Sequence, residues 1–509
     1  MSTPTTALPT TSSHGSRRRL RALSAAAVVG LALTVCTTTA PAQAAELVPQ
    51  TENEAEEFLD DRAAEDPSTL DRDSVPEGIS VEEAQKAVEK TDELTPADVE
   101  YAAAQEDLPA SGVPEDFYRT PDSLPSADGT VLKQADSDFY LDPVKLIKHD
   151  AKSTVFMYKT TDEKGQARAA TATLLTPNSA SGHADDAVVI SPGTQGIADK
   201  CAPSRQMGMG TEYEGISVAS ALAAKHPVVV VDYMGLGTEG THHFVNRVEE
   251  GRSVLDAARA VQQVDGSEID EDTKLQLRGY SQGGHATTAA LELQKEWAPE
   301  LNIASASAGA VPVDLHKTVS GLSSVYTAFA LYGVVGFADQ ADIDTSDFLN
   351  EKGQKMVAET ADKCTVEALL STAFTDGKSL TKNGESFTDI IDEHFTDIVD
   401  RQRLGKAAVP DVPLLVNHSR LDDVISFDQG KELASTWCRA GHKVGLRGQS
   451  RAHSLRRLRR SPAPHRDLHQ SHLRGQGSAR QLLEAVTSHP HRGGPPSWGI
   501  CPHRGGPPG

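Results

Sequence analysis

Beyond its amino terminus, this chain of 509 residues has no long hydrophobic run. No later stretch approaches the roughly 18 uninterrupted apolar residues of a membrane-spanning helix. The chain has no Cys-x-x-Cys spacing of the kind that binds zinc, and no basic patch before the carboxyl terminus of the kind that nucleic acid requires. These absences argue against a membrane-spanning protein, a zinc site and a nucleic-acid partner. A hydrophobic content of 38% is still sufficient for a large core.

The amino terminus carries the pattern of an export signal. Four arginines within residues 17–21 precede an apolar run over residues 22–35, and small residues follow up to Ala44. This pattern is typical of a secretory signal peptide (residues 1–44), cleaved near Ala44, so the mature protein is expected to be secreted. A twin-arginine signal and a lipid-attachment site at Cys36 are weaker alternatives, and the sequence leaves the export route open.

Most of the net charge of -23 comes from one segment. Residues 46–107 contain 21 acidic residues and only four basic ones. Residues 45–132 are therefore predicted to be an acidic, partly disordered extension with one helix at 81–90. A solvated extension is favoured over an inhibitory prosegment.

Short apolar runs alternate with helical segments once sustained order begins, near residue 142. Two strand-like runs at 155–158 and 168–176 predict an antiparallel hairpin. Four shorter runs follow at 187–190, 226–231, 274–278 and 303–307, with helices at 216–224 and 253–264 between them. Continuous apolar runs such as those at 187–190 and 226–231 belong to a parallel sheet that is buried on both faces. The order predicts an α/β fold with a mostly parallel, doubly wound sheet.

Over residues 311–400 the sequence shows helical patterns only, with no strand-like run between them. Helical patterns occur at 325–337, 352–359, 365–373 and 387–398, before a strand resumes at 412–416 and a helix follows at 428–439. The α/β core is therefore predicted at 133–310 and 401–445. Residues 311–400 would form an inserted helical cap over the site, or else a separate helical domain.

The candidate nucleophile is Ser281, within Gly279-Tyr280-Ser281-Gln282-Gly283-Gly284. A strand-like run precedes the motif and an alanine-rich helix follows it. A sharp strand-to-helix turn of this kind forces the serine into a strained conformation and needs glycines around it. The helix amino terminus is partly positive and would stabilise a developing oxyanion.

Ser281 needs a base, and the base needs an acid to orient it. Asp422 follows the strand at 412–416 and is the preferred acid, with Asp423 as the alternative. Among the later histidines, His442 and His453 are candidates for the base, and His453 fits a loop after one more helix and strand.

The oxyanion hole is predicted from two backbone N–H groups. One belongs to Gln282, and the other comes from residues 193–196, most simply Thr194.

These residues together resemble the secreted lipase family of the α/β-hydrolase fold, which contains bacterial secretory lipases and the yeast lipase A type. The resemblance spans residues 156–441 and rests on the motif at 279–284 and on these further stretches: Gly193-Thr194-Gln195-Gly196, Cys201-Ala202-Pro203-Ser204, residues 232–238, and Asp422-Asp423 leading to Trp437-Cys438.

The resemblance implies a triacylglycerol lipase or carboxylesterase of the EC 3.1.1 type that acts in lipid catabolism. It would have no metal or organic cofactor, a lipid ester as substrate, and transient contact with a lipid interface. Four cysteines after the signal allow three pairings. The resemblance implies a disulfide between Cys201 and Cys364, with Cys438 paired near the carboxyl terminus. Oligomeric state and acyl-chain preference are left open.

The tail has a different composition from the rest of the chain. From residue 441 onward there are 11 arginines and 8 histidines but only two acidic residues. A frameshift in a GC-rich gene produces such an excess, and it is favoured over a nucleic-acid-binding or metal-binding tail. Residues 446–509 are therefore predicted to be frameshifted and disordered. Two alternative functions remain: an acyltransferase with the same machinery, and a catalytically impaired protein that binds lipid.

Overall fold

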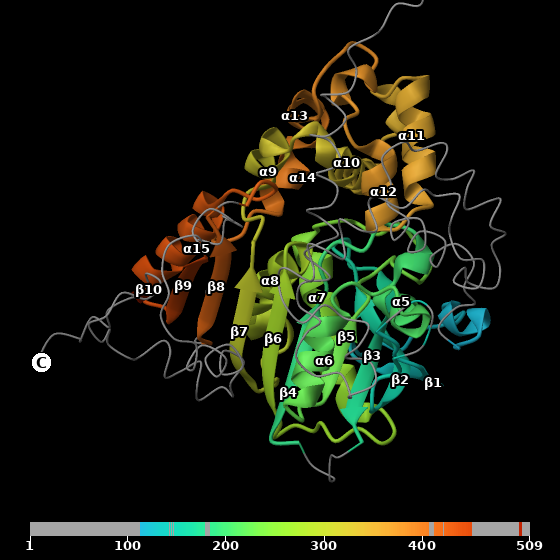
Figure 1. Ribbon diagram of the computed structural model, residues 1–509, viewed down its shortest axis with the longest axis vertical. Helices are drawn as coiled ribbons and strands as arrows, with labels where there is room; N and C mark the ends of the chain where they lie inside the picture. Colours follow the sequence, from blue (N-terminus) through green and yellow to red (C-terminus); the bar gives the residue numbers. More distant parts are fainter. Residues whose placement is uncertain are drawn as a thin grey trace, which may run out of the picture. The chain divides into compact units, whose positions relative to one another are not determined.

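The computed structural model describes residues 112–449, except 142, 144, 146, 179–183, 407–411 and 421, together with a strand at 498–500. The signal peptide, the helix predicted at 81–90 and nearly all of the tail lie outside these residues. The described chain forms one ten-stranded mixed sheet, in the order β1-β2-β3-β5-β4-β6-β7-β8-β9-β10. Helices pack against it, and a group of further helices lies beyond one edge of the strands (Figure 1).

The strands have the following bounds: β1 Val131–Ser137, β2 Ala151–Thr161, β3 Ala167–Pro177, β4 Asp186–Ser191, β5 Val228–Val231, β6 Lys274–Tyr280, β7 Ile303–Gly309, β8 Leu414–Ser419, β9 Val444–Gln449 and β10 Trp498–Ile500. β2 and β3 form the predicted antiparallel hairpin, and β3 pairs antiparallel with β5. The strands from β5 to β9 are parallel, and β10 returns antiparallel beside β9. The prediction of a mostly parallel α/β sheet is confirmed.

The chain order reverses around β4. From β4 the chain crosses to β5 on one side, and then to β6 on the other side of β4. In parallel α/β sheets, ligands bind outside the carboxyl ends of the strands at such a switch point. The segments that leave β4 and β6 are the loop with Thr194 and the turn with Ser281, so the topology brings these two residues to the same edge.

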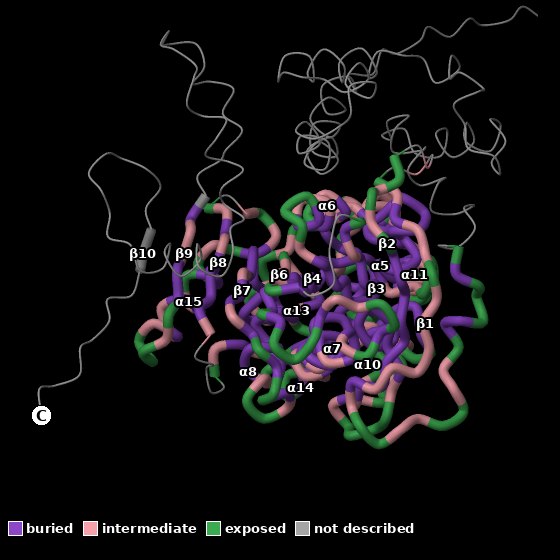
Figure 2. Tube along the Cα trace, turned by 90° about the horizontal axis from the view of Figure 1, so that it is seen from below, coloured by how far each residue is buried: buried purple, intermediate pink, exposed green. Residues whose placement is uncertain are grey.

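Alternating side chains bury the two faces of the sheet against different helices. On one face, Val188, Val228 and Val230 pack with residues of α6 (Gly215–Ala223). On the other face, Val189 and Val229 join the largest core cluster, which includes residues of α7 (Arg247–Ala260), α8 (Gln282–Trp297) and α15 (Phe427–Arg439). A seven-residue helix, α5 (Pro203–Met209), is entirely buried. Figure 2 shows the resulting buried interior around β3, β4 and β6.

The helices predicted over residues 311–400 are present and form a cap between β7 and β8. Its helices are α9 Leu315–Gly321, α10 Thr327–Ala341, α11 Glu351–Ala361, α12 Thr365–Thr372, α13 Phe387–Ile390, a π-helix Ile391–Phe395 and α14 Thr396–Arg401. The cap has its own apolar cluster, which Phe244 and Val245 of the core also join. The cap therefore packs on the core and is not a separate domain.

Two predicted boundaries of the core differ from the structure. Order begins before residue 142, because a short 3-10 helix (Glu115–Tyr118) and β1 precede it. At the other end, β9 continues to Gln449, beyond the predicted limit at residue 445, because each of its residues pairs with β8. No single described helix is long and apolar enough to cross a membrane, although α9 and the segment 324–341, bent by 111°, together meet that length and composition.

Candidate active site

Ser281 lies at the turn between β6 and α8, as the motif predicts. Its backbone has φ 56° and ψ -119°, a region that side-chain-bearing residues rarely occupy. The Ser281 N–H donates to the Gly309 carbonyl at the end of β7, at 2.9 Å. The serine is therefore fixed to the neighbouring strand, with its side chain at the carboxyl edge of the sheet.

Three glycines around Ser281 allow close backbone contacts. A Cβ atom on Gly279 would overlap the Gly283 carbonyl, one on Gly283 would overlap the Ser191 carbonyl, and one on Gly284 would overlap the Gly309 carbonyl. None of the three has a positive φ. They are therefore required for close packing of α8 on β4, β6 and β7, which is the steric role that the sequence motif implies.

The two residues predicted to supply the oxyanion hole, Gln282 and Thr194, line the same cavity as Ser281. Gln282 is the first residue of α8, so its N–H has no acceptor within the helix. In the loop after β4, the Gly193 N–H donates to Glu214 Oε1 at 3.1 Å. The N–H of Thr194 has no acceptor among the described residues. Thr194 itself is buried.

The loop after β8 holds both candidate acids. Asp422 Oδ1 accepts hydrogen bonds from the N–H groups of Val424 and Ile425, at 3.1 and 2.8 Å, and its side chain is only 7% exposed. Asp423 is exposed and accepts a hydrogen bond from the Tyr326 hydroxyl of the cap at 2.8 Å. Neither carboxylate caps α15, whose N-cap residue is Ser426. Asp422 has the geometry of a buried orienting acid, whereas Asp423 connects the loop to the cap.

The histidines fall in different places. His442 precedes β9, at the opposite edge of the sheet from Ser281, which removes it as a candidate base. His418 lies within β8 and its Nε2 donates to the Ile425 carbonyl at 2.9 Å. His453 lies outside the described residues. It follows the end of β9 by four residues, after α15 and β9, and this is the helix-and-strand spacing that the sequence predicts.

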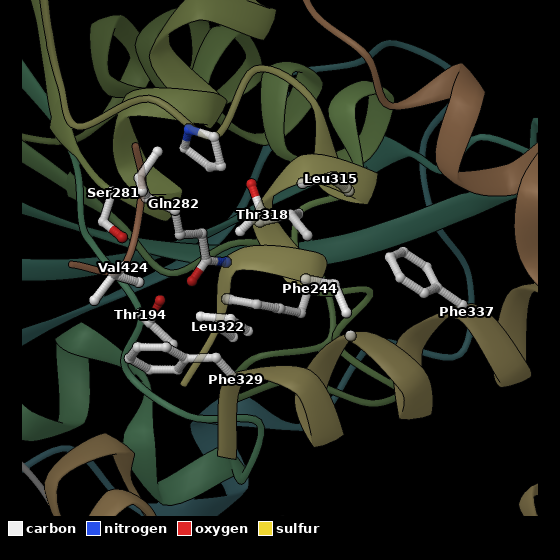
Figure 3. Close-up of a pocket in the computed structure, with 15 residues that line it drawn as sticks. Thr194, Phe244, Ser281, Gln282, Leu315, Thr318, Leu322, Phe329, Phe337 and Val424 are labelled. Carbon is white, nitrogen blue, oxygen red and sulfur yellow. The ribbon is translucent and has the colours of Figure 1, made fainter. Parts of the chain in front are cut away.

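A mostly apolar cavity extends from Ser281 under the cap (Figure 3). Its volume is only about 50 Å³, so it is a narrow space that is partly open to solvent. Ser281, Gln282 and Thr194 lie at one end of the cavity and Phe337 at the other (Figure 3). The remaining lining is largely apolar and comes from three segments: Phe244 and Val245 of the core; Leu315, Val319, Leu322 and Phe329 of the cap; and Val424 and Ile425 of the loop with Asp422. The lining has the apolar character that a hydrocarbon chain requires.

A buried polar network holds Gln282, the residue after the candidate nucleophile. The sequence did not predict this network. The Gln282 Nε2 donates to Glu250 Oε1 at 2.7 Å and to His242 Nε2 at 2.8 Å. Burial lowers the pKa of His242, and this favours the neutral ring that the second bond needs. His285 of α8 is fully buried, with Nδ1 at 3.1 Å from Glu250 Oε2. Hydrogen bonds to Glu250 and His242 therefore fix the position of the Gln282 side chain.

The electrostatic surroundings of the serine are acidic. Partial burial, together with the charges of Asp422, Glu214 and Asp423, raises the pKa of Tyr280 to about 12. These carboxylates therefore lie close to the residue before Ser281. No group of three or more His, Cys, Asp or Glu side chains in the described ranges could hold a metal ion.

The predicted disulfide between Cys201 and Cys364 is present. It joins the loop after β4 to the amino terminus of α12 in the cap. Beside it, the Thr365 hydroxyl donates to the Thr194 carbonyl at 2.6 Å, and the Thr365 N–H donates to the Gln195 carbonyl at 2.9 Å. The cap is therefore connected directly to the loop that lies beside Ser281. Cys438 is also disulfide-bonded.

Comparison with known proteins agrees with this geometry. The secreted triacylglycerol lipase LIP5 of Malassezia globosa is 27% identical over 259 residues, which are 48% of this chain and 53% of LIP5, so that match spans about half of the relative's length. Lipase A of Moesziomyces aphidis is 27% identical over 356 residues, which are 65% of this chain and 73% of the relative.

The closed crystal structure of Candida antarctica lipase A superposes with a TM-score of 0.58 at 25% identity, covering 68% of this chain and 82% of that one. The fold is thus that of the α/β-hydrolases. Residues 201–463 match the secretory lipase family, a match that continues beyond residue 441, where the motif resemblance ended, and that includes His453. The chain belongs to the secretory lipase family.

Proposed function

We propose that the protein is a secreted serine hydrolase that cleaves carboxylic esters of lipids, as a triacylglycerol lipase or carboxylesterase does. The observation that carries this proposal is the strained Ser281 at the end of an apolar cavity under the cap. An acyl chain would occupy the cavity and bring the ester carbonyl to the serine. Burial of the chain would thus orient the reacting carbon.

In the proposed reaction, Ser281 Oγ attacks the ester carbonyl while a histidine takes its proton. The N–H groups of Gln282 and Thr194 stabilise the oxyanion, and their free donors support this assignment. The histidine then gives the proton to the leaving alcohol, which leaves an acyl-enzyme on Ser281. Water, deprotonated by the same histidine, releases the fatty acid and regenerates the serine.

Asp422 is the proposed acid and His453 the proposed base. Asp422 Oδ1 is held by two N–H groups, and Oδ2, which lies 3.7 Å from His418 Nε2, is the oxygen proposed to orient the catalytic histidine. The position of His453 just past β9 and its inclusion in the family match support it as the base.

Export is proposed to occur through the amino-terminal signal, with cleavage near Ala44. The secreted relatives support an extracellular location. The route, general or twin-arginine, can be determined by blocking each route in the host and measuring the protein in the medium.

Fluorophosphonate labelling of the exported protein tests the proposal. The reagent should modify Ser281, identified by peptide mapping, and Ser281→Ala should not be labelled. The wild type should hydrolyse p-nitrophenyl esters of both short and long acids. A wild-type protein that is neither labelled nor active would refute the function and leave a lipid-binding role in its place.

A further inference from the structure

A short segment after α5 contacts three consecutive residues of the loop that carries Thr194. Glu214 Oε1 accepts from the Gly193 N–H at 3.1 Å, the Tyr213 hydroxyl donates to the Thr194 carbonyl at 2.9 Å, and Gln195 Nε2 donates to Glu212 Oε1 at 2.9 Å. Residues 212–214 are here named the 212–214 clamp. Each clamp residue thus fixes one residue of the loop.

The clamp determines which backbone N–H of the loop can donate a hydrogen bond to a substrate. Because Glu214 takes the Gly193 N–H, that donor is not available, whereas the Thr194 N–H has no acceptor within the described residues. The Thr194 carbonyl is held from two sides, by Tyr213 of the core and by Thr365 of the cap. The orientation of this peptide segment is therefore set by side chains distant from the nucleophile in sequence.

The clamp also contains two carboxyl groups in an environment without a described cation. Burial raises the pKa of Glu212 and of Glu214, and the charge of Glu212 raises the pKa of Glu214 further. The other titratable groups that face the clamp are Asp232 and Tyr233 after β5, and Tyr280 at the end of β6. All of them are neutral or negative, so none offsets a negative charge on Glu214.

We propose that residues 212–214 are positioning residues that aim the Thr194 N–H at the oxyanion, and that ionisation of Glu214 slows ester hydrolysis at alkaline pH. This inference rests on the proposed function. A negative charge beside Gly193 lies close to the position where the oxyanion forms, and like charges repel strongly in a partly buried site. A neutral Glu214 can still accept the Gly193 hydrogen bond through its carbonyl oxygen.

The kinetic test compares Glu214→Gln with Glu214→Ala on p-nitrophenyl butyrate, from about pH 6 to about pH 10. The glutamine keeps an acceptor for Gly193 but cannot ionise. Glu214→Gln should keep kcat within about 3-fold of the wild-type value near neutral pH. At alkaline pH, where the rate of the wild type falls, this variant should retain its rate. The alanine removes the acceptor and should lower kcat by about 10-fold with little change in KM, since removal of a whole oxyanion donor costs about 100-fold or more. Glu239→Ala, on an exposed loop residue, is the matched control.

Hydrogen exchange provides a readout that does not need activity. The peptide covering residues 193–196 should exchange faster in Glu214→Ala than in the wild type or in Glu239→Ala. Two results would overturn the inference, whether or not hydrogen exchange of residues 193–196 increases. One is a loss of rate at alkaline pH in Glu214→Gln that equals that of the wild type, and the other is a wild-type kcat in Glu214→Ala. If the wild type hydrolyses no ester, the proposed function fails, and the exchange result alone then decides whether the clamp exists.

Discussion

At the scale of single residues, the two neighbouring acids after β8 have separate contacts. Asp422 is held by two backbone N–H groups, whereas Asp423 accepts from the Tyr326 hydroxyl of the cap. Only the first is built like an acid that orients a catalytic histidine. An asparagine in its place would hold the histidine in the wrong tautomer.

Asp422→Asn is therefore expected to lower kcat/KM by about 10³ to 10⁴-fold. Asp423→Asn keeps an acceptor for Tyr326 and should change kcat/KM by less than about 10-fold. Both are measured on p-nitrophenyl esters. The opposite ranking would move the role of the acid to Asp423.

Some residues of the site could be predicted from the sequence and others could not. The difference is whether a single short motif contains them. Ser281 and Gln282 lie in one short motif with a glycine on either side, and the motif specifies both roles. Glu250 reaches Gln282 from 32 residues away, and Glu214 reaches Gly193 from 21 residues away. Contacts of this kind depend on how α7 and the loops pack, and no spacing in the sequence encodes them.

At the scale of elements, the cap is joined to the core by the Cys201–Cys364 disulfide. The bridge closes a separation of 163 residues, and a cross-link of that length strongly restricts the unfolded chain.

Replacing both cysteines with alanine should lower the free energy of unfolding by about 2–5 kcal/mol, measured by chemical denaturation. Activity should fall as well, because Thr365 beside the bridge holds Thr194. Ser371→Ala, also on α12, leaves the bridge intact and is the control. Equal stability of the double variant and the wild type would show that the hydrogen bonds alone hold the cap.

A second link between core and cap is titratable. His243 Nδ1 lies 2.8 Å from Glu249 Oε2, and Nε2 lies 2.8 Å from Asp339 Oδ2 of α10. Burial lowers the pKa of His243, but the hydrogen bonds and charges of Glu249 and Asp339 outweigh it, so that the pKa is raised overall. In the same contact the pKa of Asp339 is lowered: burial raises it, and the His243 hydrogen bond outweighs that effect.

A histidine with a raised folded-state pKa stabilises the protein fully below its unfolded pKa, and this stabilisation is lost as pH rises through the folded pKa. The link should therefore weaken above neutral pH, and below about pH 4 as Asp339 protonates. His243→Gln should remove about 1 kcal/mol of stability near pH 6 and flatten its decline toward pH 9, by denaturation at each pH. His226→Gln is the control, and an identical pH profile for His243→Gln and the wild type would contradict the link.

Elements with strong apolar patterns were predictable, and those without were not. The central parallel strands β4 and β5 consist largely of buried valine, alanine and isoleucine, so each appears as a continuous apolar run. β1 (Val131–Ser137) has no such run: it contains Lys133, Gln134 and Asp136, and only its pairing with β2 makes it a strand. α5 is too short to show a helical period, although it is fully buried.

At the scale of the whole molecule, the proposed catalytic residues are divided between the described core and the segment after β9. His442 lies before β9, at the edge opposite Ser281, and His453 follows β9. His453→Ala should therefore lower kcat/KM by about 10⁴-fold or more, and His442→Ala should leave it near the wild-type value. Full activity in His453→Ala would mean that another histidine serves as the base.

The composition of the tail is still best explained by a shift of reading frame. We propose that the shift lies within residues 446–509, because the excess of arginine, histidine and proline begins there and persists to the carboxyl terminus. Resequencing of the gene decides this: an uninterrupted frame ending near Gly509 would refute it.

The geometry around Ser281 has a consequence for how such a protein evolves. Its strained turn is imposed by backbone contacts of Gly279, Gly283 and Gly284 and by the bond to Gly309, and none of these involves the serine hydroxyl. The turn would keep its form after the hydroxyl was lost. Loss of catalysis and loss of fold are thus separate events in this architecture, and a descendant without chemistry would inherit a ready-made apolar pocket.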